Sequence, residues 1–93
     1  MTKENLKTYV NKQIEEMNTS VDWARDRMNE FDYAFRLDWV CGAIENADCK
    51  AMGAINFASI WDESVDRRTA DELREILHKG WSDAMDRAHE ELI

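Results

Sequence analysis

The chain has no proline and only three glycines among its 93 residues. Hairpin turns depend on Gly, Asn-Gly and Pro, so their scarcity disfavours a β-rich fold and flexible linkers. With 44% apolar and 34% charged residues, the composition still lies in the range of folded globular proteins. We therefore expect an all-α fold that forms a single helical domain over residues 1–93, large enough for one modest core.

Long apolar runs are missing as well. No segment approaches the roughly eighteen consecutive apolar residues of a membrane helix, and the start of the chain lacks the apolar region of a secretory signal. The sequence thus predicts a cytoplasmic protein that does not bind a membrane. In that compartment Cys41 and Cys49, the only two cysteines, are expected to be free thiols.

Catalytic and metal-binding patterns are equally scarce. His78 and His89 are the only histidines, and eleven residues of helix would separate them by about 16 Å, too far to share a metal ion. The cysteines form no C-x-x-C pair, and Asp62, Glu63 and Asp66 lack the spacing of a calcium-binding loop. The sequence therefore predicts a protein that is not an enzyme and that uses no metal or other cofactor.

Acidic residues, in contrast, are plentiful. Twenty Asp and Glu residues against twelve Lys and Arg give a formal net charge of −8. The excess is uneven, because residues 1–14 are net positive by two whereas residues 15–93 are net negative by ten. Such a surface disfavours direct binding of DNA or RNA and instead faces water or a basic partner.

Apolar residues recur at helical spacing along most of the chain. The polar segment 18–20 is expected to end the first helix, and the second is either continuous or broken near 29–32. Asp48 can cap a third helix, while Thr69 and Glu72 match a capping box at the start of a fourth. The sequence therefore predicts a compact bundle of about four helices. They are expected over residues 3–17, 20–46, 48–61 and 69–92.

Several carboxylates are spaced to share a helix face. Asp22, Asp26 and Glu30 stand at i, i+4 and i+8, which would stack them about 6 Å apart, close to the spacing of backbone phosphates. Similar groupings occur in the last helix and in the preceding loop, so we predict an acidic partner-binding surface. Its candidate residues are Asp22, Trp23, Asp26, Glu30, Trp61, Asp62, Glu63, Asp66, Asp83, Asp86 and Glu90.

Four tryptophans are a second unusual feature in so small a chain. Trp39 and Trp81 lie near apolar stripes, so we expect them in the core. Trp23 stands at the edge of its stripe and Trp61 at a helix end, beside acidic residues. These two are expected to be partly exposed and to anchor a partner.

A strip of alanines marks a place where helices can approach closely. Its members stand at i, i+4, i+7 and i+11, on one face of a helix. This strip is expected to pack against a neighbouring helix or, alternatively, against a helix of a partner or of a second copy, and in the last case the protein would be a homodimer. The strip consists of Ala47, Ala51, Ala54 and Ala58.

In size, acidity and helical character the chain resembles the small anti-CRISPR and anti-restriction proteins that phages and plasmids use against host nucleases. The resemblance is one of class and involves no shared motif. It implies an inhibitor that acts as a DNA mimic and occupies the basic nucleic-acid-binding surface of an enzyme or complex. The alternative is a helical interaction or assembly module, such as a homodimer, an antitoxin-like partner or an immunity protein, whose acidity serves only solubility.

Overall fold

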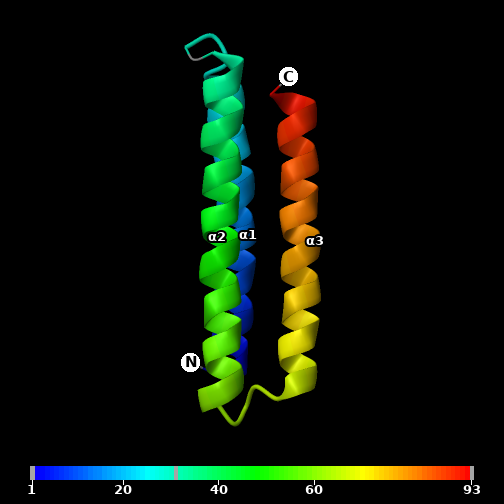
Figure 1. The fold of residues 1–93 in the computed structure, drawn as a ribbon. Helices are drawn as coiled ribbons and strands as arrows, with labels where there is room; N and C mark the ends of the chain where they lie inside the picture. The colour runs from blue at the N-terminus through cyan, green and yellow to red at the C-terminus, as the bar shows by residue number, and fades with distance from the viewer. Residues whose placement is uncertain (1, 31, 93) are drawn as a thin grey trace.

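Three long helices lie side by side in an up-down-up arrangement (Figure 1). In the computed structural model, which describes residues 2–30 and 32–92, α1 spans Lys3–Asp26, α2 spans Tyr33–Trp61 and α3 spans Arg67–Glu91. No strand occurs in those ranges, so the predicted all-α bundle is confirmed, but its helices number three rather than about four. The bundle is a rod of 49 × 17 × 16 Å, with the two chain ends at opposite tips (Figure 1).

α1 continues through the segment that was predicted to end it. Residues 18–20 lie inside the helix, and the side chains of Asn18 and Ser20 hydrogen-bond back to carbonyl groups one turn earlier, at 3.1 and 3.0 Å. Val21 and Ala24 extend the buried stripe of α1 past this segment. Burial of that stripe outweighs the weak local preference of the polar residues, because propensity differences are only tenths of a kcal/mol per residue.

Of the two alternatives for the second predicted helix, continuous or broken near residues 29–32, the structure has the break. The chain turns over residues 27–30, and Phe31, which belongs to the same segment, lies outside the described residues. Asp32 caps α2, since its carboxylate accepts a hydrogen bond of 2.8 Å from the backbone N–H of Phe35. A strong N-cap therefore sets the start of α2.

Arg36 closes this end of the bundle from the inside. Its side chain is almost fully buried, and one Nη atom donates to the carbonyl of Met28 at 2.8 Å. The other Nη atom donates to the carbonyl of Leu92 at 3.3 Å. One guanidinium group thus joins the turn after α1 to the end of α3.

α2 passes without interruption through Asp48, so separate helices over 20–46 and 48–61 are wrong. Ala47 and Ala51, on either side of that position, are both buried in one stripe, and only a continuous helix buries them together. Asp48 does not act as a cap, and its partial burial raises the pKa of its carboxyl.

α3 begins two residues earlier than predicted. Asp66 is its N-cap and accepts a hydrogen bond of 2.8 Å from the backbone N–H of Thr69. The capping box predicted at Thr69 is therefore wrong, because a carboxylate three residues upstream already occupies the capping role. Thr69 lies in the first turn of the helix and is buried.

The core runs along the axis of the rod and receives side chains from all three helices. Gly80 lets α1 approach α3 closely, because a Cβ atom at this position would lie 2.7 Å from the side chain of Ile14. Within the described helices, none is long and apolar enough to cross a membrane. The largest fully buried side chains are Leu6, Val10, Met17, Val21, Val40, Ile44, Ile55, Leu77 and Leu92.

Candidate functional site

α2 is the least charged of the three helices. Five of its 29 residues are charged, against nine of 24 in α1 and twelve of 25 in α3. α1 and α3 each have one apolar stripe, whereas apolar side chains surround α2 on all sides. A helix of that kind is normally buried all round, yet one side of α2 faces solvent.

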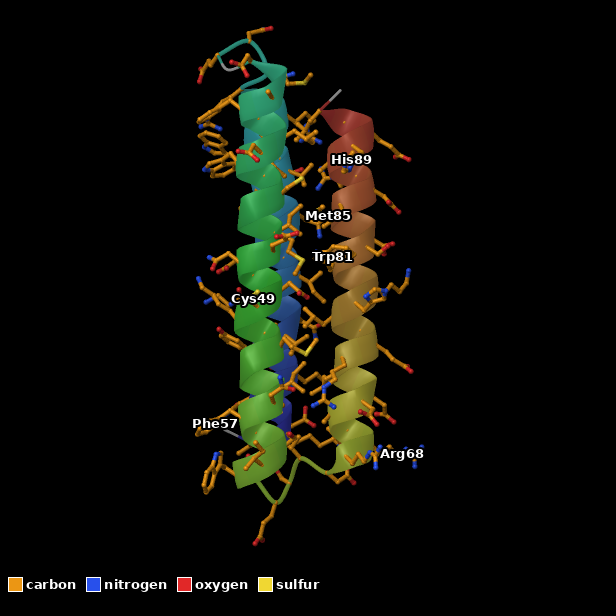
Figure 2. The ribbon with its side chains drawn as sticks, viewed as in Figure 1. Cys49, Phe57, Arg68, Trp81, Met85 and His89 are labelled. Carbon is orange, nitrogen blue, oxygen red and sulfur yellow. The ribbon has the colours of Figure 1, made fainter. Side chains whose placement is uncertain are left out.

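Large apolar side chains of α2 are exposed at both of its ends. Near the C-terminal end, Phe57 is 66% exposed, Ile60 72% and Trp61 73%. Near the N-terminal end, Phe35 is 51% and Trp39 41% exposed. Phe57 projects from α2 on the side away from α3 (Figure 2). Monomeric proteins rarely leave so much apolar surface in water, so these residues mark a candidate interaction site.

The first aromatic pair joins α1 and α2. The ring centroids of Trp23 and Trp39 lie 4.6 Å apart with their planes tilted by 39°. The guanidinium carbon of Arg27 lies over Trp23, 4.4 Å from the ring centroid, in a cation–π contact. Because Trp39 is 41% exposed, the expectation that it lies in the core is wrong. Trp81, in contrast, is half-buried and packs against the core, on the side of α3 toward α2 (Figure 2).

The second aromatic pair lies at the other end of α2. The ring centroids of Phe57 and Trp61 are 6.3 Å apart with a tilt of 40°. A groove of about 430 Å³ runs between this pair and α1, with Tyr9 on its α1 side. We call the surface that contains both pairs the aromatic face. It comprises Tyr9 and Trp23 of α1 with Phe35, Trp39, Phe57 and Trp61 of α2.

A repeat in the sequence of α2 explains why these rings share a face. The pattern Phe-x-x-x-Trp occurs at 35–39 and again at 57–61. Twenty-two residues make about six helical turns, so the two pairs emerge on the same side, about 33 Å apart. Gly-Ala-Ile also recurs, at 42–44 and 53–55, with the eleven-residue spacing that keeps a face in register. Trp23 and Trp61 were predicted from the sequence. The repeat is the signal that would also have indicated the other aromatic residues of α2.

Comparison with known proteins identifies no relative of the chain. No protein-family model matches it, and searches of curated proteins and of solved structures found no match. The function is therefore inferred from the side chains and their arrangement alone.

The predicted stripe of three carboxylates in α1 does not form. Asp22 and Asp26 lie in the last turns of the helix, but Glu30 lies beyond its end, so the three do not share one helix face. Asp22 is moreover engaged with α3, because Arg87 pairs with its carboxylate, and Arg25 lies 3.4 Å from the same oxygen. Its charge is therefore largely used within the fold.

Arg87 is the centre of a polar network between α1 and α3. Its guanidinium group hydrogen-bonds to the carboxylates of Asp22 and Glu91 and, at 3.2 Å, to the backbone carbonyl of Asn18. Arg25 of α1 adds an ion pair to Glu91 at 2.9 Å. The hydrogen bonds from Arg87 hold the pKa values of both carboxyl groups below their usual range. This network lies along the outer edge of the contact between α1 and α3, which we call the α1–α3 seam.

The acidic loop before α3 serves local structure. The Asp62 carboxylate accepts hydrogen bonds from the backbone N–H and the hydroxyl of Ser64, at 2.9 and 2.7 Å, and these lower the pKa of Asp62. Asp66 is the N-cap of α3, and the hydrogen bond from the Thr69 N–H lowers its pKa. Glu63 is exposed between them. Two of the three predicted binding carboxylates in this loop therefore help to shape the connection.

The acidic residues predicted on α3 lie on its outer surface. Asp83, Asp86 and Glu90 are all exposed, and Lys79 pairs with Asp83 at 3.1 Å. These positions lie away from the aromatic face, because that face is built from α1 and α2. The structure thus brings Trp61 and Asp62 together at the groove, but it does not gather the other predicted acidic residues there.

The alanine strip points into the bundle. Ala47, Ala51 and Ala58 are 5%, 0% and 3% exposed, and Ala54 is half-buried at the edge of the groove. The strip therefore packs against other helices of the same chain, and its three buried members are not accessible to a second copy.

The two thiols differ in environment. Both are free; Cys49 is exposed on α2, whereas Cys41 is half-buried. That burial, together with the charges of Glu45 and Asp38, raises the pKa of the Cys41 thiol. Over residues 2–30 and 32–92, no cluster of three or more His, Cys, Asp or Glu side chains is arranged to hold a metal ion.

Proposed function

We propose that the chain is a helical interaction module that binds another protein chain through the aromatic face. One observation carries this proposal: Phe57 and Trp61 are 66% and 73% exposed on a helix that is apolar all round. Aromatic side chains contribute much of the binding energy in protein interfaces once a partner removes them from water. The groove beside Tyr9 adds a concave surface into which a partner side chain fits.

The placement of charge supports the same proposal. Asp22 and Glu91 are held by Arg87, and Asp66 caps a helix, so several carboxylates have a role within the fold. The remaining acidity then serves solubility, which a protein with an exposed aromatic surface needs.

A second candidate function is the acidic inhibitor, a DNA mimic of the anti-CRISPR or anti-restriction class that occupies a basic nucleic-acid-binding surface. It is favoured by Asp86 and Glu90, which are exposed one turn apart on the outside of α3. Its partner would be a nucleic-acid-binding enzyme or complex, and the contact would weaken as salt screens the charges.

A capture experiment with two matched double variants tests both candidates. The tagged chain is incubated with a lysate of its native cells at about 0.1 M and about 0.5 M salt, and retained proteins, the chain itself included, are identified by mass. The variants are Phe57→Ser/Trp61→Ser on the aromatic face and Asp86→Asn/Glu90→Gln on α3, with folding of each checked by circular dichroism.

For the interaction module we expect retention at both salt concentrations that only the aromatic variant abolishes. Retention that disappears at the higher salt and in the acidic variant, but survives Phe57→Ser/Trp61→Ser, would contradict the interaction module. That result would support the acidic inhibitor instead.

A further inference from the structure

The occupant of the aromatic face is, we propose, a second copy of the chain, packed antiparallel about a two-fold axis near the middle of α2. This inference rests on the proposed function and names its partner. It follows from the order of side-chain sizes along α2, from the charge of the face and from its area.

The aromatic residues of α2 are placed symmetrically about position 48. Phe35 and Trp61 are equidistant from it, and so are Trp39 and Phe57. In a two-fold interface, residue i of one copy meets residue j of the other, and residue j of the first meets residue i of the second. Two antiparallel copies of α2 therefore place each aromatic pair against the opposite aromatic pair of the partner.

Small residues flank the centre of the face, on either side of Asn46 and Lys50. Gly42 and Ala43 are related to Ala54 and Gly53 by the same symmetry. A Cβ atom added at Gly42 or Gly53 would have no neighbour within 4 Å, so both glycines border open space. Small side chains opposite small side chains let two helices approach closely, because the distance between helix axes depends on the residues at the contact. The rings at both ends then reach across to the other copy.

The centre of the face carries little net charge although the whole chain carries −8. Its central polar residues on α2 are Asn46 and Lys50, both exposed and also symmetric about position 48. In the dimer the Lys50 ammonium group therefore meets an amide oxygen that accepts its hydrogen bond. On the α1 edge, Lys12 and Glu16 share the helix side of Tyr9 and have opposite charges. The centre of the face therefore does not repel a second copy.

The exposed area suits a small, stable dimer. The four rings of α2 are between 41% and 73% exposed. Because a buried Phe or Trp side chain removes roughly 150–250 Å² from water, these four leave on the order of 500 Å² of aromatic surface to be covered. Ile60 and the small residues between the pairs add to that area. A standard stable interface buries about 800 Å² per partner, which the face approaches.

Measuring molar mass across a concentration series is the first test. We expect the 10.9-kDa chain to have twice its monomer mass in light scattering or sedimentation equilibrium as concentration rises. Gly53→Leu adds a bulky side chain beside the centre of the face and Phe57→Ser removes a ring, so each should weaken dimerisation about tenfold or more. Glu75→Leu, which adds the same side chain to the outside of α3, is the matched control and should not weaken it.

If the chain stays monomeric at all concentrations up to about 0.5 mM, dimerisation contributes at most about 4–5 kcal/mol. That result would overturn the proposal. So would a dimer that Gly53→Leu and Phe57→Ser leave intact. Circular dichroism of each variant separates lost dimerisation from lost folding, and at Gly53 the open space leaves room for the new side chain.

Spin labels test the antiparallel orientation. In a Cys41→Ser/Cys49→Ser background, a label at Ser59→Cys lies eleven residues from position 48 in each copy. The two labels should then be about 33 Å apart along the helix direction. Labels on native Cys49, in the Cys41→Ser variant, lie beside the axis and should be close together. Short distances at both positions indicate parallel helices and would overturn the proposal.

The outcome for the dimer is separable from that for the interaction module. One outcome is a monomeric chain in which Phe57→Ser/Trp61→Ser still abolishes capture of a different protein. In that case the proposed dimer is wrong and the proposed interaction module is supported. If the chain is monomeric and the double variant leaves capture unchanged, both proposals fail.

Discussion

The side of α1 that faces α3 is closely packed, whereas the surface that α1 shares with α2 is partly open. Toward α3, Ile14 fits against Gly80, and Arg87 closes the outer edge with hydrogen bonds to α1. Toward α2, Tyr9 and Trp23 are half-buried, and the four rings of α2 in the aromatic face are exposed beside an open groove. Both ion pairs that join two helices within the described residues connect α1 to α3. The contact between α1 and α3 is thus complete within the chain, whereas the aromatic face leaves apolar surface that a partner can cover.

The largest expected effect is at the α1–α3 seam. Gly80→Leu forces a side chain into the space of Ile14, so we expect the free energy of unfolding to fall by about 2–3 kcal/mol in urea denaturation. Ile14→Ala in the same chain should recover part of that loss, because it removes the atoms that clash. Unchanged stability of the single variant would show that α1 and α3 are not in close contact here.

Removing the centre of the polar network should cost less. Arg87→Met keeps most of the side chain's length but loses the hydrogen bonds to α1 and within α3, so we expect a loss of about 1–2 kcal/mol in the free energy of unfolding. Arg68→Met is the matched control, because Arg68 is highly exposed and pairs with Glu72 on the outside of α3, so the change should alter stability by less than about 0.5 kcal/mol. Equal effects of the two variants would contradict a special role for Arg87.

The contribution of Arg87 should also depend on pH. Its hydrogen bonds lower the pKa of Asp22 from an ordinary 3.8 and that of Glu91 from an ordinary 4.5. Carboxyl groups with lowered pKa values stabilise the fold above their unfolded-state values, and this contribution is lost as pH falls through the folded-state values. We expect the stability difference between wild type and Arg87→Met to be constant above about pH 5 and to shrink below pH 4. A difference that grows on acidification would contradict this assignment.

On the aromatic side of the comparison, a glycine substitution should have the opposite sign. Gly53→Ala adds a Cβ atom to open space and improves helix propensity, so we expect the monomer to gain about 0.5–1 kcal/mol in thermal or urea unfolding. Gly80→Ala is the matched control at the seam and should not be stabilising. A loss at Gly53 would mean that this side of α2 is already covered within the chain.

The smallest change in stability is expected from the exposed rings themselves. Phe57→Ser/Trp61→Ser removes two side chains that are 66% and 73% exposed, so the monomer's free energy of unfolding should change by less than about 0.5 kcal/mol. Binding of a hydrophobic dye should fall clearly in the same variant. A large loss of stability would show that these rings belong to the core, and the seam and the aromatic face would then be alike.

Local patterns in the sequence indicate the helical class but not all the helix ends. The lack of proline and the helical spacing of apolar residues predict the bundle. The polar residues at 18–20 and Asp48 suggest ends that do not exist, because buried neighbours on both sides keep the helices continuous. At the start of α3 the N-cap is Asp66 and not the predicted Thr69, because the capping residue depends on where the preceding loop meets the helix.

The acidic surface was harder to predict than the aromatic one. Arg87 lies 65 residues from Asp22 in the sequence, so no local pattern indicates that it engages this carboxylate. Exposure of Trp61 followed from its place at a helix end. Exposure of Trp39 did not, because α2 is apolar on all sides and spacing alone cannot tell its inner face from its outer one.

The fit of Ile14 against Gly80 also fixes how far α3 can slide along α1. These helices run in the same direction, and the two residues are 66 positions apart, the same separation as Arg25 and Glu91. α3 contains no other glycine, so a slip of one turn, about 5.4 Å, would bring Ile14 against a residue that carries a side chain. The absence of a side chain at Gly80 thus fixes the register of α3 against α1, and this register places Arg25 beside Glu91.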